Sequence, residues 1–104
     1  MIMQALGMIE TKGYVAFVEA ADVMAKTAAV KIISMERIGS SLLTIMVTGD
    51  VGAVEAAVAA GCEKCKEYGD LIAYKVIPNP HKALEEVLPS MANYFDPEEE
   101  FNEE

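Results

Sequence analysis

The chain is poor in the residues and segments that most often serve catalysis, membrane insertion or nucleic-acid binding. Its 104 residues include no tryptophan, one histidine and two cysteines. No apolar run approaches the roughly 18 to 20 residues that a membrane-spanning helix needs, and the first residues lack the basic side chains of a signal peptide. The eight lysines and arginines are scattered, so they form no patch for a phosphate backbone. We therefore expect a cytoplasmic protein without membrane or nucleic-acid partners.

Residues that could act in catalysis or bind a metal are equally scarce. Cys62 and Cys65 have the spacing of a redox pair or half a zinc site, but they come late in a predicted helix and no second cysteine pair exists. We interpret them as small buried or half-buried thiols. No nucleophile and base form a visible pair, so we predict no catalytic residue, no metal site and no cofactor. A site assembled between subunits stays an open alternative.

Small apolar residues and a cluster of acids are what the chain has in excess. The hydrophobic fraction is 53%, above the roughly 45 to 50% of typical soluble domains, and the length suits one domain. Six of the seventeen acidic residues lie between positions 96 and 104. We expect residues 1–89 to form the domain and residues 90–104 to form an acidic, disordered tail.

Hydrophobic periodicity predicts four strands and two long helices. Apolar and β-branched runs predict strands at residues 4–11, 31–37, 42–48 and 70–77. Apolar spacings of three and four, which include Tyr14 and Val18, predict a helix over residues 14–29. A second helix is predicted over residues 51–68, with the Asp50 carboxylate as its N-cap and Gly69 at its end.

The order of these elements predicts a ferredoxin-like α+β fold. In this βαββαβ arrangement two helices cover one face of a four-stranded antiparallel sheet. Pro78 and Pro80 end the last strand, since neither can donate to a ladder, and residues 81–88 predict a short C-terminal helix. Because no helices remain for the second sheet face, we expect oligomerisation to bury that face or an edge.

Five motifs connect the chain with a known family; they occupy residues 5–13, 19–22, 36–40, 49–54 and 76–81. In order and spacing they resemble the hexamer-forming, single-domain shell proteins of bacterial microcompartments (the BMC domain family), over about residues 3–89. The resemblance implies a structural protein that is not an enzyme. It implies cyclic homohexamers that tile edge to edge into a shell, with other shell proteins and encapsulated enzymes as partners.

A pore is the first site that the resemblance implies. In the family, the loop between the second and third strands surrounds the six-fold axis and passes small polar metabolites. A glycine allows close approach at such an axis, and a serine offers polar donors. An ordinary hairpin turn is the local alternative. The family usually has lysine at position 37 and glycine at position 41, so pore selectivity does not carry over. The corresponding residues here are Arg37, Ile38, Gly39, Ser40 and Ser41.

The edge between hexamers is the second implied site. Lys26 corresponds to the family's edge lysine, which donates to backbone carbonyls of the neighbouring hexamer; locally, an Asp22–Lys26 pair at i,i+4 is the alternative. Asn79 and His81 belong to the edge motif. Asn79 stands where the family usually has arginine, so a planar group with five donors is lost.

A different function class also fits a fold of this size. Ferredoxin-like chains serve as small-molecule-sensing regulatory domains that form dimers or trimers. The oligomeric state distinguishes this alternative from a hexameric shell protein.

Overall fold

The structure is a computed structural model that describes residues 4–38, 42–81 and 84. Six elements follow one another, and the predicted βαββαβ order is confirmed. The predicted boundaries lie within two residues of those observed. Of the predicted helix 81–88 only His81 and Leu84 are described, and the Leu84 amide donates to the His81 carbonyl oxygen at 3.0 Å. The elements are β1 (Ala5–Lys12), α1 (Tyr14–Thr27), β2 (Lys31–Ile38), β3 (Leu42–Gly49), α2 (Val51–Tyr68) and β4 (Asp70–Ile77).

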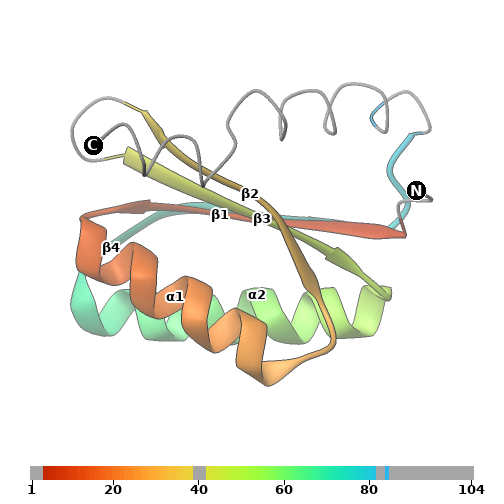
Figure 1. Ribbon diagram of the computed structural model, residues 1–104, viewed down its shortest axis with the longest axis horizontal. Coiled ribbons are helices and arrows are strands. Elements are labelled where there is room, and N and C mark those ends of the chain that lie inside the picture. The colour runs from red at the N-terminus through yellow and green to blue at the C-terminus, as the bar shows by residue number, and fades with distance from the viewer. Residues whose placement is uncertain (1–3, 39–41, 82–83, 85–104) are drawn as a thin grey trace.

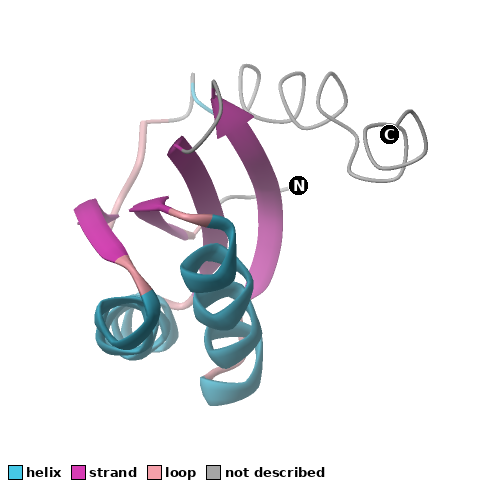
Figure 2. Ribbon diagram, turned by 90° about the vertical axis from the view of Figure 1, so that its left-hand side faces the viewer, coloured by secondary structure: helices cyan, strands magenta, loops and turns pink. Residues whose placement is uncertain are grey.

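The four strands form one antiparallel sheet in the order β2-β3-β1-β4 (Figure 1). The central strand β1 pairs with β3 from Ala5↔Gly49 to Lys12↔Leu42, and with β4 on its other side. Both helices lie on one face of the sheet, as Figures 1 and 2 show. The predicted ferredoxin-like α+β fold is confirmed, and neither α1 nor α2 covers the second face of the sheet.

The hydrophobic core fills the space between the sheet and the two helices. Side chains at alternate positions of a strand point to the same face, and the odd-numbered positions of β1 and β3 point to the helices. Each large aliphatic side chain buried there stabilises the fold by about 1.5 to 3 kcal/mol. The core also takes small residues from α1 and α2, which let the helices approach closely. Its members include Ala5, Ile9, Leu43, Ile45, Val47, Ala16, Ala20, Met24, Val54, Ala57 and Val58.

Two glycines permit the closest contacts of α2. A Cβ atom at Gly7 of β1 would lie 2.7 Å from methyl carbons of both Val54 and Val58. A Cβ atom at Gly61 of α2 would lie 2.6 Å from the Ile9 Cδ1 atom and 2.8 Å from Met24 Cγ. These distances are shorter than van der Waals contact, so α2 lies against β1 only because neither position carries a side chain.

Two predictions concern the ends of α2, and only the one for its C-terminal end is confirmed. Gly69 ends the helix, and its amide donates to the Cys65 carbonyl oxygen at 2.9 Å. Asp50 occupies the N-cap position, but the prediction that its carboxylate caps the helix is wrong, because its side chain makes no capping hydrogen bond. Asp50 is exposed, so water can solvate the carboxylate. Its backbone carbonyl accepts the first helical bond, from the Val54 amide at 2.8 Å.

The contact at Gly7 can be tested with a matched pair of substitutions. We expect Gly7→Ala to lower the free energy of unfolding by about 1 to 3 kcal/mol, because the added methyl meets two stiff β-branched side chains. Gly52→Ala, in the first turn of α2 with no atom within 4 Å of the added Cβ, should leave that free energy unchanged or raise it by up to about 1 kcal/mol. Urea unfolding at equal subunit concentration measures both; equal effects would contradict the packing role of Gly7.

Candidate functional site

The hairpin between β2 and β3 lies at one end of the domain. Ile38 pairs with Leu42 at its mouth, and Arg37, the neighbouring strand residue, is exposed. Because the strands are antiparallel, this end also holds the end of β1, the start of α1, the end of α2 and the start of β4; Figure 2 views the domain from this end. The predicted pore residues Gly39, Ser40 and Ser41 lie outside the described residues.

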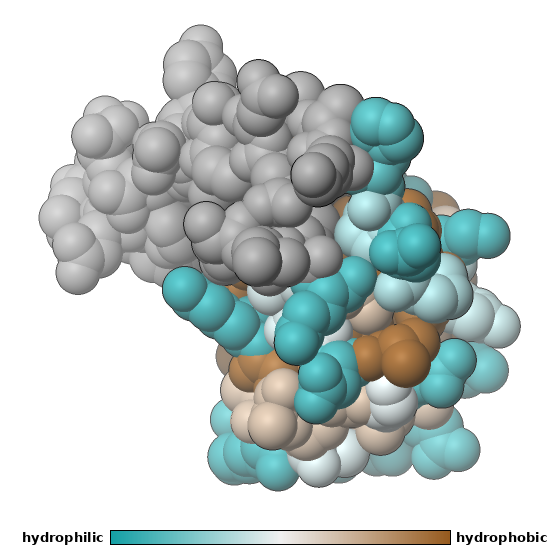
Figure 3. Space-filling view, turned by 90° about the vertical axis from the view of Figure 1, so that its right-hand side faces the viewer, coloured by the Kyte–Doolittle hydropathy of each residue, from teal (hydrophilic) through white to brown (hydrophobic). Residues whose placement is uncertain are grey.

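The predicted edge residues lie at the opposite end. Lys26 is in the last turn of α1, and Asn79 and His81 follow the end of β4; all three are exposed. Strands of eight residues at about 3.3 Å per residue separate the two ends by roughly 25 Å. In Figure 1 the hairpin is on the left and these residues' elements end on the right. Figure 3 views the right-hand end, where hydrophilic side chains are interspersed with apolar patches.

The local alternative for Lys26 is confirmed, since its Nζ atom lies 2.8 Å from Asp22 Oδ2. The hydrogen bond and charge of Asp22 raise the pKa of Lys26. Both side chains are mostly exposed, at 72% and 55%, so water screens the pair and it contributes little to stability. Lys26 therefore keeps its positive charge and remains accessible to a neighbouring molecule.

Exposed apolar side chains gather on two lateral surfaces of the domain, which we call the α1 flank and the β4 flank. The sequence analysis did not predict these exposed side chains. On α1 they are Tyr14, Val15 and Val18, with exposed fractions of 56%, 59% and 44%. Ile72 and Tyr74 of β4 are 48% and 62% exposed. Because α2 packs on β1 and β4 while α1 packs on β1 and β3, the α1 flank and the β4 flank lie on opposite sides of the domain.

Tyr14 and Val18 were predicted on the buried side of their helix, and the structure places them on its exposed side. Ala16, Ala20 and Met24 are the residues of α1 that are fully buried. Val18 lies two residues from Ala16 and Ala20, so at 100° per residue it points about 200° away from them. The 3.6 periodicity alone could not choose between these two sides, because α1 carries apolar residues on both.

The two cysteines are buried free thiols on α2, as predicted. Burial raises the pKa of both thiols, with a smaller opposing effect of Lys66 on Cys62 and a smaller added effect of Asp70 on Cys65. Thiols of this kind form little thiolate at neutral pH and are poor nucleophiles. Within residues 4–38, 42–81 and 84, no group of three or more His, Cys, Asp or Glu side chains could hold a metal ion.

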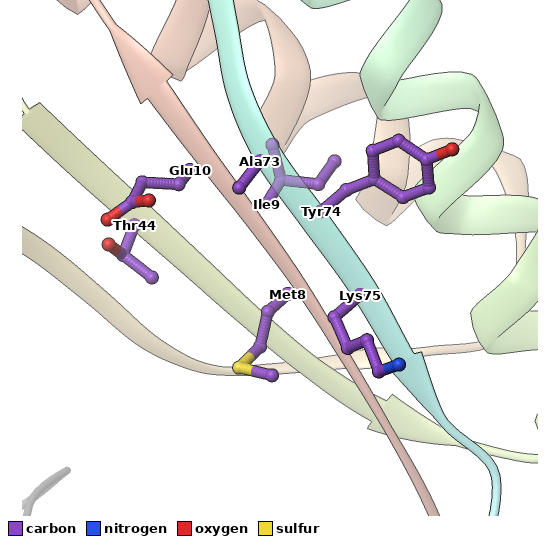
Figure 4. Close-up of a pocket in the computed structure, with 7 residues that line it drawn as sticks. All are labelled: Met8, Ile9, Glu10, Thr44, Ala73, Tyr74 and Lys75. Carbon is purple, nitrogen blue, oxygen red and sulfur yellow. The ribbon is translucent and has the colours of Figure 1, made fainter.

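The sheet face without helices, called the open face below, has a shallow depression of about 190 Å³. Figure 4 shows Met8 and Lys75 side by side on β1 and β4. Glu10 and Thr44 lie next to each other farther along the face, and Tyr74 is directed away toward α2. The sequence analysis did not assemble this site. Alternation along residues 5–12 and 42–49 could have indicated which side chains share the face, but not the order of the strands. Its lining residues are Met8, Ile9, Glu10, Thr44, Ala73, Tyr74 and Lys75.

Comparison with known proteins agrees with this architecture. The sequence profile of the BMC domain matches residues 5–80. The bacterial microcompartment shell protein PduA of Citrobacter freundii is 51% identical over 89 residues, which cover 86% of this chain and 96% of PduA. The shell protein EutM of Salmonella typhimurium is 52% identical over 84% of this chain and 91% of EutM. The carboxysome shell protein CsoS1A of Hydrogenovibrio crunogenus is 51% identical over 81% of this chain and 88% of its own.

A solved structure is similar in fold. A microcompartment protein from Desulfitobacterium hafniense superposes with a TM-score of 0.74 and 39% sequence identity, over 83% of this chain. The match covers 49% of that protein, so the present chain spans about half of its length.

The chain belongs to the BMC domain family of bacterial microcompartment shell proteins. Its close relatives are structural shell proteins and not enzymes, in agreement with the expectation from the sequence. Within the described part of the chain, neither helix combines the length and apolar character needed to cross a membrane.

Proposed function

We propose that the chain forms cyclic homohexamers that tile into a microcompartment shell, with a pore for small polar metabolites at each six-fold axis. Residues 37–41 line the pore, and Lys26, Asn79 and His81 meet the neighbouring hexamer. The shell role rests on the relatives. The observation that carries the finer proposal is the position of the two residue sets at opposite ends of the domain.

Opposite ends suit the geometry of a tile. In a cyclic assembly one end of each subunit faces the axis, and the other faces the rim. The hairpin end can approach the axis without moving the core, because Arg37 is exposed there and connections between strands run over the protein surface. The end with Lys26 and Asn79 then reaches the rim, where polar side chains can bond to backbone carbonyls of a neighbour.

The flanks support a ring of this kind. A cyclic assembly of more than two subunits uses head-to-tail contacts, so two different surfaces of the same chain must fit each other. The α1 flank with Tyr14, Val15 and Val18 and the β4 flank with Ile72 and Tyr74 are two such surfaces, and their exposed apolar area favours burial. Contact of the α1 flank with the β4 flank of the next subunit would place every hairpin on the same side of that contact.

Native mass spectrometry tests the ring directly. We expect six copies, with larger species at higher concentration, because both flanks and the rim have unburied surface. Two or three copies, together with a shift in stability when small molecules are added, would instead support the regulatory-domain alternative. A monodisperse monomer at micromolar concentration would contradict both.

The rim can be tested by reversing one charge. Lys26→Asp should leave hexamers intact but reduce sheet formation in electron micrographs, because a carboxylate would face carbonyl oxygens that an ammonium group could satisfy. Lys66→Asp is the matched control, because Lys66 is also an exposed base in the last turn of a helix. Both variants lose the same favourable charge at a helix C-terminus. Equal sheet formation in the two variants would contradict a contact of Lys26 with the neighbouring hexamer and leave only its ion pair with Asp22.

The pore can be tested by filling it. Ser40→Leu should reduce solute flux across assembled shells, because six added apolar side chains would occupy the lumen and remove polar donors. We expect the unfolding midpoint to stay unchanged, because connections between strands run over the protein surface. Ser40→Ala removes the hydroxyl without filling space and serves as the control.

Arg37→Ala should weaken any preference for anions over cations, more clearly at low salt. Unchanged flux in all variants, with hexamers intact, would make the loop an ordinary turn.

A further inference from the structure

The open face is most apolar at the end where β4 finishes. Leu6 points to this face and pairs with Ile77, yet it is only 3% exposed and does not belong to the core cluster. Met8, Met46 and Ile77, on the same face, are half-buried. Since both helices cover the other side, these side chains need a cover that the core does not provide.

The depression next to this apolar end has the size of an aromatic side chain. Dry cavities of about 150 Å³ accommodate a benzene ring, and the depression measures about 190 Å³. Met8 and Ala73 supply apolar walls, and methionine adapts well to an aromatic partner. Glu10 and Lys75 lie on its border (Figure 4), where a phenolic hydroxyl could bond to either of them.

The chain passes to this same side of the sheet after β4. In Figure 1 the blue segment that follows β4 leaves the sheet on the side opposite the helices. The turn closed by the bond from the Leu84 amide to the His81 oxygen is the last described feature, and twenty residues follow it.

These last residues are unlike a segment that only solvates the protein. Three of the seven aromatic residues lie beyond position 93, whereas disordered acidic segments have few aromatics. Met91, Tyr94 and Phe95 precede six of the eight acidic residues that follow Leu84, since those six lie at Asp96 and beyond. The family profile ends at residue 80, so this group of apolar residues lies beyond the part of the chain that defines the family.

We propose that the C-terminal segment covers the open face of its own subunit, with Met91, Tyr94 and Phe95 packed on the depression and the residues from position 96 onward in solvent. Ten residues from Leu84 to Tyr94 span about 15 Å as helix and about 33 Å when extended. The distance from β4 across β1 to β3 is two strand spacings, or about 10 Å. The segment is therefore long enough to reach the depression.

The chain's own segment is favoured over a second copy because it starts at the border of the face. A tethered segment has an effective concentration in the millimolar range for short flexible linkers. A weak contact through three side chains can then hold the segment on the face. This inference does not depend on the hexamer, since the cover comes from the same subunit.

Methionine oxidation by dilute hydrogen peroxide, followed by peptide mass spectrometry, tests the cover with residues that the chain already has. We expect Met8 to oxidise several-fold faster in the double variant Tyr94→Ala, Phe95→Ala than in the unchanged full-length chain. Met24, which is 0% exposed in the core, should stay slow in both and reports that the fold is intact. Phe101→Ala, in the acidic end, is the matched control and should behave like the unchanged chain.

Equal Met8 oxidation in all three proteins would overturn the proposal. A second result would also overturn it: Met8 stays protected in the double variant and loses its protection only under conditions where native mass spectrometry shows dissociation. A second copy of the chain would then be the cover. If Met24 also became reactive, the double variant would have lost its fold, and disulfide trapping would test the proposal instead. Ala73→Cys should form a disulfide with Phe95→Cys faster than with Phe101→Cys, and equal rates would overturn the proposal.

Discussion

The close approach of α2 to β1 is the contact on which the rest of the structure depends. It requires that Gly7 has no side chain, because any Cβ atom there would overlap the methyl groups of Val54 and Val58. Gly61 serves the same purpose on the helix side, toward Ile9 and Met24. With both contacts made, α2 covers β1 and β4, α1 lies beside it, and the core closes on one face of the sheet. Small residues at these positions hold the layers close enough for native packing density.

A core closed on one face leaves the two ends, the two flanks and the open face for other tasks. The hairpin end and the end with Lys26 and Asn79 are separated by the length of the strands, and the flanks carry exposed apolar side chains on α1 and β4. A flat tile with an axis, a rim and two unlike sides needs the same set of surfaces. The open face is the last of these surfaces, and its polar border and apolar end suit a cover by the chain's own last residues.

The fold was predictable from the sequence because its signals are local. Each signal spans only a few residues: alternation along residues 42–49 predicts a strand, the alanine-rich run of α2 predicts a helix, and the prolines after Ile77 predict the end of β4. Side-chain details that depend on tertiary contact were not predictable: the Asp50 carboxylate makes no capping bond, and Val18 lies on the exposed side of α1. The position of Lys26 opposite the hairpin could have been derived from the element order, because α1 runs antiparallel to β1. The depression on the open face needed the strand order β2-β3-β1-β4, which periodicity does not contain.

Pulsed electron paramagnetic resonance on spin-labelled hexamers tests most directly whether the hairpin end faces the axis. One label is attached at Ser40→Cys and, in a second protein, at Asn79→Cys, both with Lys26→Asp to keep hexamers dispersed. Cys62 and Cys65 are buried, so they label slowly. In a ring with the hairpins at its centre, the shortest distance between labels on adjacent subunits is smaller for position 40 than for position 79. Equal distances, or a smaller distance for position 79, would contradict a pore formed by residues 37–41.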